Sequence, residues 1–114
     1  MKFIKALLFT TLVLAIPSLG MAQSIDLGRG ALPLTIPSNY SAGTPMPLIV
    51  LLHGYTFSGA RQDAYMGFSK LADRYGFLFV APDGNKEPGG DENRFWNASP
   101  ACCDFFSTGI DDSS

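Results

Sequence analysis

The chain has 114 residues, with eight basic and ten acidic side chains, one histidine, two cysteines and a formal net charge of −2. This length allows one domain at most. A slightly acidic chain lacks the basic surface that nucleic-acid binding requires, so nucleic acid is not an expected partner.

The first 22 residues have the three-part pattern of a secretory signal. Residues 1–5 carry two lysines, residues 6–16 form an apolar run, and Pro17 with small residues follows up to Ala22. A run of 11 residues is shorter than the roughly 20 that span a bilayer. We expect cleavage after Ala22 and a secreted protein, extracellular or periplasmic, with no stable membrane association. The alternative is an uncleaved anchor. The mature residues 23–114 then carry a net charge of −4.

The first part of the mature chain predicts one weak and one strong strand. Residues 23–29 are polar and expected to be loose, and residues 31–36 alternate enough for an edge strand, where Pro33 is permitted. Residues 37–47 are rich in proline and predict a loop. The continuous apolar run 48–52 predicts a strand that is buried on both faces, as in a parallel sheet.

The next part predicts a helix and a second buried strand. Apolar residues at spacings of three and four predict a helix over about 60–75, in which Gly67 is a mild cost and Gly76 a stop. Residues 77–81 predict the second strand, followed by the turn 82–84. Strand, helix and strand in this order predict a βαβ unit with a parallel sheet.

The later residues predict no further buried element. Residues 85–93 are charged and rich in glycine and predict a surface loop. Asp83 is better explained as part of a turn than as a catalytic acid or a metal ligand. Asp111 and Asp112 are better explained as the start of a helix than as a paired-carboxylate site. No group of side chains has the spacing of metal ligands, so we expect neither a metal nor a cofactor.

His53 and Gly54 directly follow the predicted strand 48–52. Functional loops in parallel sheets lie at the carboxyl ends of strands. A His-Gly turn there bends the backbone and can aim N–H groups at the oxyanion that develops in acyl transfer. This interpretation is favoured over an ordinary tight turn.

These motifs, in this order, resemble secreted α/β-hydrolase esterases of the polyhydroxybutyrate depolymerase and feruloyl esterase group. The resemblance rests on the stretches 47–54, 71–84, 95–98, 102–103 and 110–112. It implies an α/β fold, the amino-terminal part of an α/β-hydrolase with a parallel sheet and flanking helices. It also implies that residues 23–114 are the first portion of a catalytic domain.

The resemblance implies a serine within Gly-x-Ser-x-Gly, followed by an acid and a histidine. No serine of this chain has glycines at both required positions, and His53 belongs to the oxyanion turn. The resemblance places the backbone N–H of Tyr55 or Thr56 as one oxyanion donor. It places Trp96 near the cleft wall, where packing is favoured over substrate contact.

Cys102 and Cys103 are adjacent in the sequence. Their Cα atoms lie closer together than an ordinary disulfide prefers. In an exported protein we therefore expect their partners outside this chain, and a bond between the two neighbours is the rarer alternative. Asn39-Tyr40-Ser41 and Asn97-Ala98-Ser99 both match the glycosylation acceptor pattern.

The leading hypothesis is an amino-terminal fragment of a secreted serine esterase that acts through an acyl-enzyme. Its substrates would be feruloyl or acetyl esters on polysaccharide, or polyhydroxyalkanoate esters. The fragment itself is predicted to be inactive because the triad is absent. One alternative is a fragment of a prolyl-oligopeptidase-like serine peptidase. Another is a small secreted carbohydrate-binding module with Trp96, Phe95, Phe105 and Phe106 as its aromatic platform.

Overall fold

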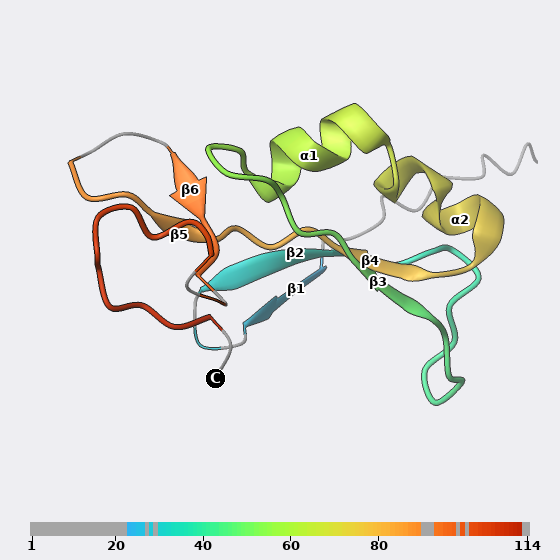
Figure 1. Cartoon of the computed structure of the whole chain (residues 1–114). Helices are drawn as coiled ribbons and strands as arrows, with labels where there is room; N and C mark the ends of the chain where they lie inside the picture. Colours follow the sequence, from blue (N-terminus) through green and yellow to red (C-terminus); the bar gives the residue numbers. More distant parts are fainter. Residues whose placement is uncertain are drawn as a thin grey trace, which may run out of the picture.

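The computed structural model describes residues 23–26, 28, 30–89, 93–97, 99 and 101–112 (Figure 1). The predicted signal, residues 1–22, lies outside these residues. Among the helices of the described residues, none has the length and the apolar composition needed to cross a membrane.

The centre of the structure is a four-stranded mixed sheet with the strand order β1-β2-β4-β3. The strands are β1 (Gln23–Asp26), β2 (Ala31–Thr35), β3 (Leu48–Val50) and β4 (Leu78–Val80). β1 pairs with β2 and β2 with β4 in antiparallel orientation, and only β3 and β4 are parallel. The expected fold, a parallel α/β-hydrolase sheet with flanking helices, is therefore wrong: the described sheet is mixed and small.

The amino-terminal hairpin was not expected from the sequence. Residues 23–26 form β1 instead of a loose segment, and they make β2 an inner strand instead of an edge strand. The Asp26 carboxylate accepts hydrogen bonds from the N–H groups of Gly28 and Gly30, at 2.8 and 3.2 Å. Both glycines have a positive φ, which lets the chain reverse within a few residues. The tight connection places β1 beside β2, where Pro33 lies opposite Ser24.

The predicted single helix is divided into shorter pieces. α1 (Gly59–Met66) is followed by a 3₁₀ helix (Ser69–Leu71) and α2 (Ala72–Tyr75). The Ser58 side chain caps the start of α1 by accepting from the N–H of Arg61. The single-helix prediction fails at Gly67, which adopts φ 74° and ends α1. The prediction that Gly76 ends the helical region is confirmed by its left-handed geometry after α2.

α1 and α2 lie on the same side of the sheet (Figure 1). The buried core is formed by Ala72 of α2 together with Phe77 and Phe79. Because side chains alternate along a strand, the other face of β3 carries Leu48 and Val50, which are 54% and 51% exposed. The predicted burial of this strand on both faces is therefore wrong, although its parallel pairing with the strand after the helix is confirmed.

The start of α1 approaches the end of β4 closely. A Cβ atom on Gly59 would collide with the carbonyl of Ala81, so only glycine fits there. The Gly59 N–H donates to the Asp83 carboxylate at 2.8 Å. This contact fixes the start of α1 beside the turn that follows β4.

Candidate functional site

The candidate site lies beyond the carboxyl ends of β3 and β4. A small second sheet, β5 (Asn85–Lys86) paired with β6 (Arg94–Phe95), follows β4 and lies beside the segment after β3 (Figure 1). The predicted surface loop 85–93 is thus wrong at its first residues, which form β5. The segment 101–112 returns to the same end of the molecule.

His53 connects the segment after β3 to the segment after β4. Its side chain is buried, and its Nε2 accepts a hydrogen bond of 2.8 Å from the N–H of Gly84. Its Nδ1 lies 2.8 Å from the carbonyl oxygen of Gly54. Because a backbone N–H can only donate, Nε2 is the acceptor and Nδ1 carries the proton. Both ring nitrogens are thus occupied by backbone groups, which gives His53 a structural role in this arrangement.

Trp96 holds the backbone at His53. Its indole Nε1 donates to the His53 carbonyl oxygen at 3.1 Å, and the two rings lie 5.2 Å apart between centroids. The side chain is half-buried. This hydrogen bond places Trp96 next to the turn and joins its ring to the backbone of His53.

Residues 54–57 form a tight turn directly after His53. The Phe57 N–H donates to the Gly54 carbonyl at 3.1 Å, and Thr56 at the third position has φ 68°. The Thr56 N–H donates to the carbonyl of Arg94 at 2.9 Å. Among the described residues, the Tyr55 N–H makes no hydrogen bond. Of the two predicted oxyanion donors, Thr56 is already bonded and Tyr55 remains available.

The Tyr55 side chain anchors the same turn to the β5–β6 hairpin. Its hydroxyl donates to the Oε1 of Glu87, a buried carboxylate whose Oε2 accepts from the Asn93 amide at 3.1 Å. The hydrogen bond to Glu87 raises the pKa of Tyr55 above its ordinary value. The Phe105 ring contacts the Tyr55 ring edge to face, with centroids 5.2 Å apart. Sequence reasoning missed Glu87, because a charged residue in a glycine-rich stretch looks like surface.

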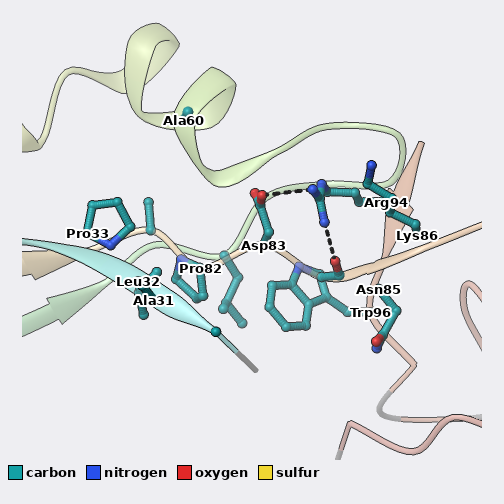
Figure 2. Close-up of a pocket in the computed structure, with 14 residues that line it drawn as sticks. Ala31, Leu32, Pro33, Ala60, Pro82, Asp83, Asn85, Lys86, Arg94 and Trp96 are labelled. Carbon is teal, nitrogen blue, oxygen red and sulfur yellow. Dashed lines mark hydrogen bonds and ion pairs between the residues drawn. The ribbon is translucent and has the colours of Figure 1, made fainter. Parts of the chain in front are cut away.

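A cavity of about 730 Å³ lies between β2 and the segment after β4. Figure 2 shows Ala31, Leu32 and Pro33 at one end of the cavity and the Trp96 ring near Asp83 and Arg94 at the other. Its size is that of ligand sites in general. Tyr55 and Thr56 do not line the cavity, so the oxyanion candidates lie outside it.

Asp83 and Arg94 form an ion pair at the polar end of this cavity. Arg94 Nη2 lies 3.2 Å from the Asp83 carboxylate, and its Nη1 donates to the Gly84 carbonyl at 3.0 Å. The other Asp83 oxygen accepts from Gly59 at the start of α1. All of these contacts stabilise the turn after β4, in agreement with a structural interpretation of Asp83.

Asp112 forms hydrogen bonds that join the two ends of the segment 97–112. Its carboxylate accepts from the Asn97 N–H at 2.7 Å and from the Asn85 side-chain amide at 3.0 Å. The Asp112 N–H donates to the Asn97 carbonyl at 2.9 Å. The helix predicted to begin at Asp111 and Asp112 would extend into residues that are not described. The cross-chain contacts of Asp112 were not predicted, since they join residues that are distant in the sequence.

The sulfur atoms of Cys102 and Cys103 are bonded to each other. The sequence favoured partners outside this chain and kept a bond between the two neighbours as the rarer alternative. In the structure the two neighbouring cysteines are paired with each other, which is the rarer alternative.

The aromatic platform of the binding-module alternative is not assembled as predicted. Phe95 is 1% exposed and belongs to the interior, whereas Phe105 and Phe106 are exposed. Trp96 is half-buried and bonded to His53. Among the described residues, no group of three or more His, Cys, Asp or Glu side chains lies close enough to hold a metal ion.

Comparison with known proteins returned no matching family model, no matching curated protein and no matching solved structure.

Proposed function

We propose that this chain contributes one side of the active site of a secreted serine esterase that hydrolyses carboxylic esters through an acyl-enzyme. The observation that carries the proposal is the backbone N–H of Tyr55. It lies in a tight turn at the carboxyl end of β3 and has no acceptor among the described residues. The sequence resemblance to secreted esterases, stated above, supports the same assignment.

The surroundings of the turn support a fixed N–H donor. Thr56 bonds to Arg94, the Tyr55 hydroxyl bonds to Glu87, and the carbonyl of His53 accepts from Trp96. An oxyanion donor is effective when it is held in place before the reaction begins, because no reorganisation is then needed as charge develops. These three contacts restrain the turn on both sides of the Tyr55 N–H.

The proposed reaction divides ester hydrolysis into two steps. A serine hydroxyl attacks the ester carbonyl, and the carbonyl oxygen becomes an oxyanion that accepts a hydrogen bond from the Tyr55 N–H. The alcohol leaves, and water then releases the acid from the acyl-enzyme. The chain has no Gly-x-Ser-x-Gly, and both nitrogens of His53 are engaged. We therefore assign the nucleophile, the base and the acid to residues beyond these 114.

The proposed substrates are esters on polysaccharide or polyhydroxyalkanoate esters. The proposed location is outside the cytoplasmic membrane, on the basis of the sequence of residues 1–22. No cofactor enters the proposed chemistry, because serine, histidine and an acid supply the nucleophile and the proton transfers.

The test compares two substitutions at Tyr55 in the esterase that contains this segment. Tyr55 is the second residue of the turn 54–57, a position at which proline is common in turns with a positive φ at the third residue. Tyr55→Pro therefore removes the N–H and suits the turn, whereas Tyr55→Ala removes the side chain and keeps the N–H. We expect Tyr55→Pro to lower kcat for p-nitrophenyl acetate about 100- to 1000-fold, and Tyr55→Ala to lower it far less.

Equal effects of the two substitutions would argue against the backbone donor. The 114-residue chain alone is expected to show no turnover of p-nitrophenyl acetate above a heat-denatured sample. Turnover by this chain that survives replacement of every serine would contradict the assignment to serine esterases.

A further inference from the structure

We propose that Asn39 is the residue of this chain that carries an N-linked glycan in the folded protein when it passes through a glycosylating export pathway, and that Asn97 is not. Both residues begin an Asn-x-Ser acceptor sequence. The structure gives them opposite surroundings. This inference concerns a surface away from the candidate site and does not depend on esterase activity.

The acceptor sequence at Asn39 is open to solvent. Asn39, Tyr40 and Ser41 are all exposed. Among the described residues, neither the Asn39 amide nor the Ser41 hydroxyl has a hydrogen-bond partner. The Asn39 Nδ2 lies beside Gly76, 3.5 Å from the place where a Cβ would be. Because Gly76 has no side chain, nothing at that position covers the amide.

The backbone around Asn39 is held in a turn. The Tyr40 N–H donates to the carbonyl of Pro37 at 3.0 Å, and Pro37 is buried. The Ser38 N–H donates to the Asp73 carboxylate at 2.5 Å. On the side of the turn these contacts use backbone groups and not the Asn39 side chain, so a glycan on its amide breaks none of them.

Asn97 has the opposite arrangement. Its side-chain Nδ2 donates to the Ile110 carbonyl at 2.7 Å, and its N–H and carbonyl both bond to Asp112. The residue is half-buried. A glycan on Nδ2 would place a sugar ring in the space between residues 97 and 110. The closed segment 97–112 and a glycan on Asn97 are therefore incompatible.

The reaction is a transfer from a lipid-pyrophosphate-linked oligosaccharide that the export pathway supplies. A bond forms between Asn39 Nδ2 and C1 of the first sugar, and the bond between C1 and the pyrophosphate oxygen breaks. The lipid pyrophosphate leaves, and the amide loses one proton to a base of the transferase. The β2–β3 loop, residues 36–47, lies at the opposite end of the sheet from β5 and β6 (Figure 1). A glycan there leaves the candidate site uncovered.

The test uses the full 114-residue chain with a host leader before Met1, expressed in a glycosylating eukaryotic cell. Ser41→Ala and Ser99→Ala each remove one acceptor sequence and leave both asparagine side chains in place. The mass of the protein from cells and medium is measured before and after treatment with an amidase that removes N-linked glycans. We expect one glycan per secreted chain, complete loss of it in Ser41→Ala, and no change in Ser99→Ala.

Two results would overturn the proposal. One is the absence of a glycan at Asn39 in both the cell and the medium fraction. The other is a secreted chain with a glycan at Asn97, found as a mass shift that Ser99→Ala removes. Neither result bears on ester hydrolysis, and failure of the Tyr55 test leaves the Asn39 proposal intact.

Discussion

Two ends of this molecule are held together by different forces. The helix-covered core depends on the burial of Ala72, Phe77 and Phe79. The end that carries the candidate site depends on hydrogen bonds that join residues far apart in the sequence, such as His53 to Gly84 and Trp96 to His53. Burial tolerates small displacements of the groups involved, whereas a hydrogen bond is sensitive to distance and direction. The end that carries the candidate site, the polar end of the molecule, is therefore suited to fix the direction of a backbone N–H.

The largest effect is expected at the core. Phe79→Ala removes a ring that is buried in the sheet and stacked near Phe68, and we expect a loss of about 3–5 kcal/mol in the free energy of unfolding. The measurement is urea unfolding of the full chain. Tyr65→Ala is the matched control, because this ring is 84% exposed on α1. A loss below 1 kcal/mol for Phe79→Ala would show that the core contributes no more than the polar end.

The next effect concerns close packing at the polar end. A Cβ at Gly84 would overlap the carbonyl of Phe95, so we expect Gly84→Ala to cost about 1–3 kcal/mol. The shift would also separate Gly84 N–H from His53. Gly54→Ala serves as the control, because no atom lies within 4 Å of its added Cβ. Equal midpoints of urea unfolding for the two variants would contradict the close approach of β6 to the segment after β4.

A smaller effect is expected from one hydrogen bond of the polar end. Trp96→Phe keeps an aromatic ring and removes the N–H donated to the His53 carbonyl, which we expect to cost about 1 kcal/mol. Tyr75→Phe removes a polar group from an exposed ring on α2 and should change stability by less than about 0.5 kcal/mol. Both are measured by thermal unfolding. If Trp96→Phe has no larger effect than its control, the indole hydrogen bond does not stabilise the turn.

The smallest effect is a pH dependence within the segment 97–112. Hydrogen bonds from Thr108 and Gly109 hold the pKa of Asp104 below the ordinary value of 3.8. The unfolded chain thus takes up this proton at higher pH than the folded chain. The contribution to stability is complete above about pH 5 and is lost as the pH falls through 3.8 and below. Asp104→Asn should flatten the pH dependence of the unfolding temperature below pH 5, and an unchanged slope would contradict this account.

The parts of the fold that the sequence predicted are those set by short-range rules. The parallel pair β3 and β4 follows from two apolar runs joined by a helical region. The stop at Gly76 follows from the preference of glycine for left-handed geometry at helix ends. Gly67 has the same preference and ends α1, although the spacing of the apolar residues predicts a helix that runs through it.

The candidate site was predicted only in part, for a related reason. The turn after His53 was found because it directly follows a recognisable strand. The commitment of Thr56 to Arg94, and of Tyr55 to Glu87, joins segments about 30 to 40 residues apart. No local pattern in the sequence carries such a pairing.

The sequence by itself determined the two apolar strands, the turn that begins at His53 and Gly54, and the adjacency of the two cysteines. Tertiary structure decided which face of the sheet is covered, which of Tyr55 and Thr56 keeps its N–H available, and which of Asn39 and Asn97 keeps its amide exposed. The physical reason is that propensities and turn chemistry act over a few residues, whereas burial and hydrogen-bond partners depend on which distant segments the fold brings into contact.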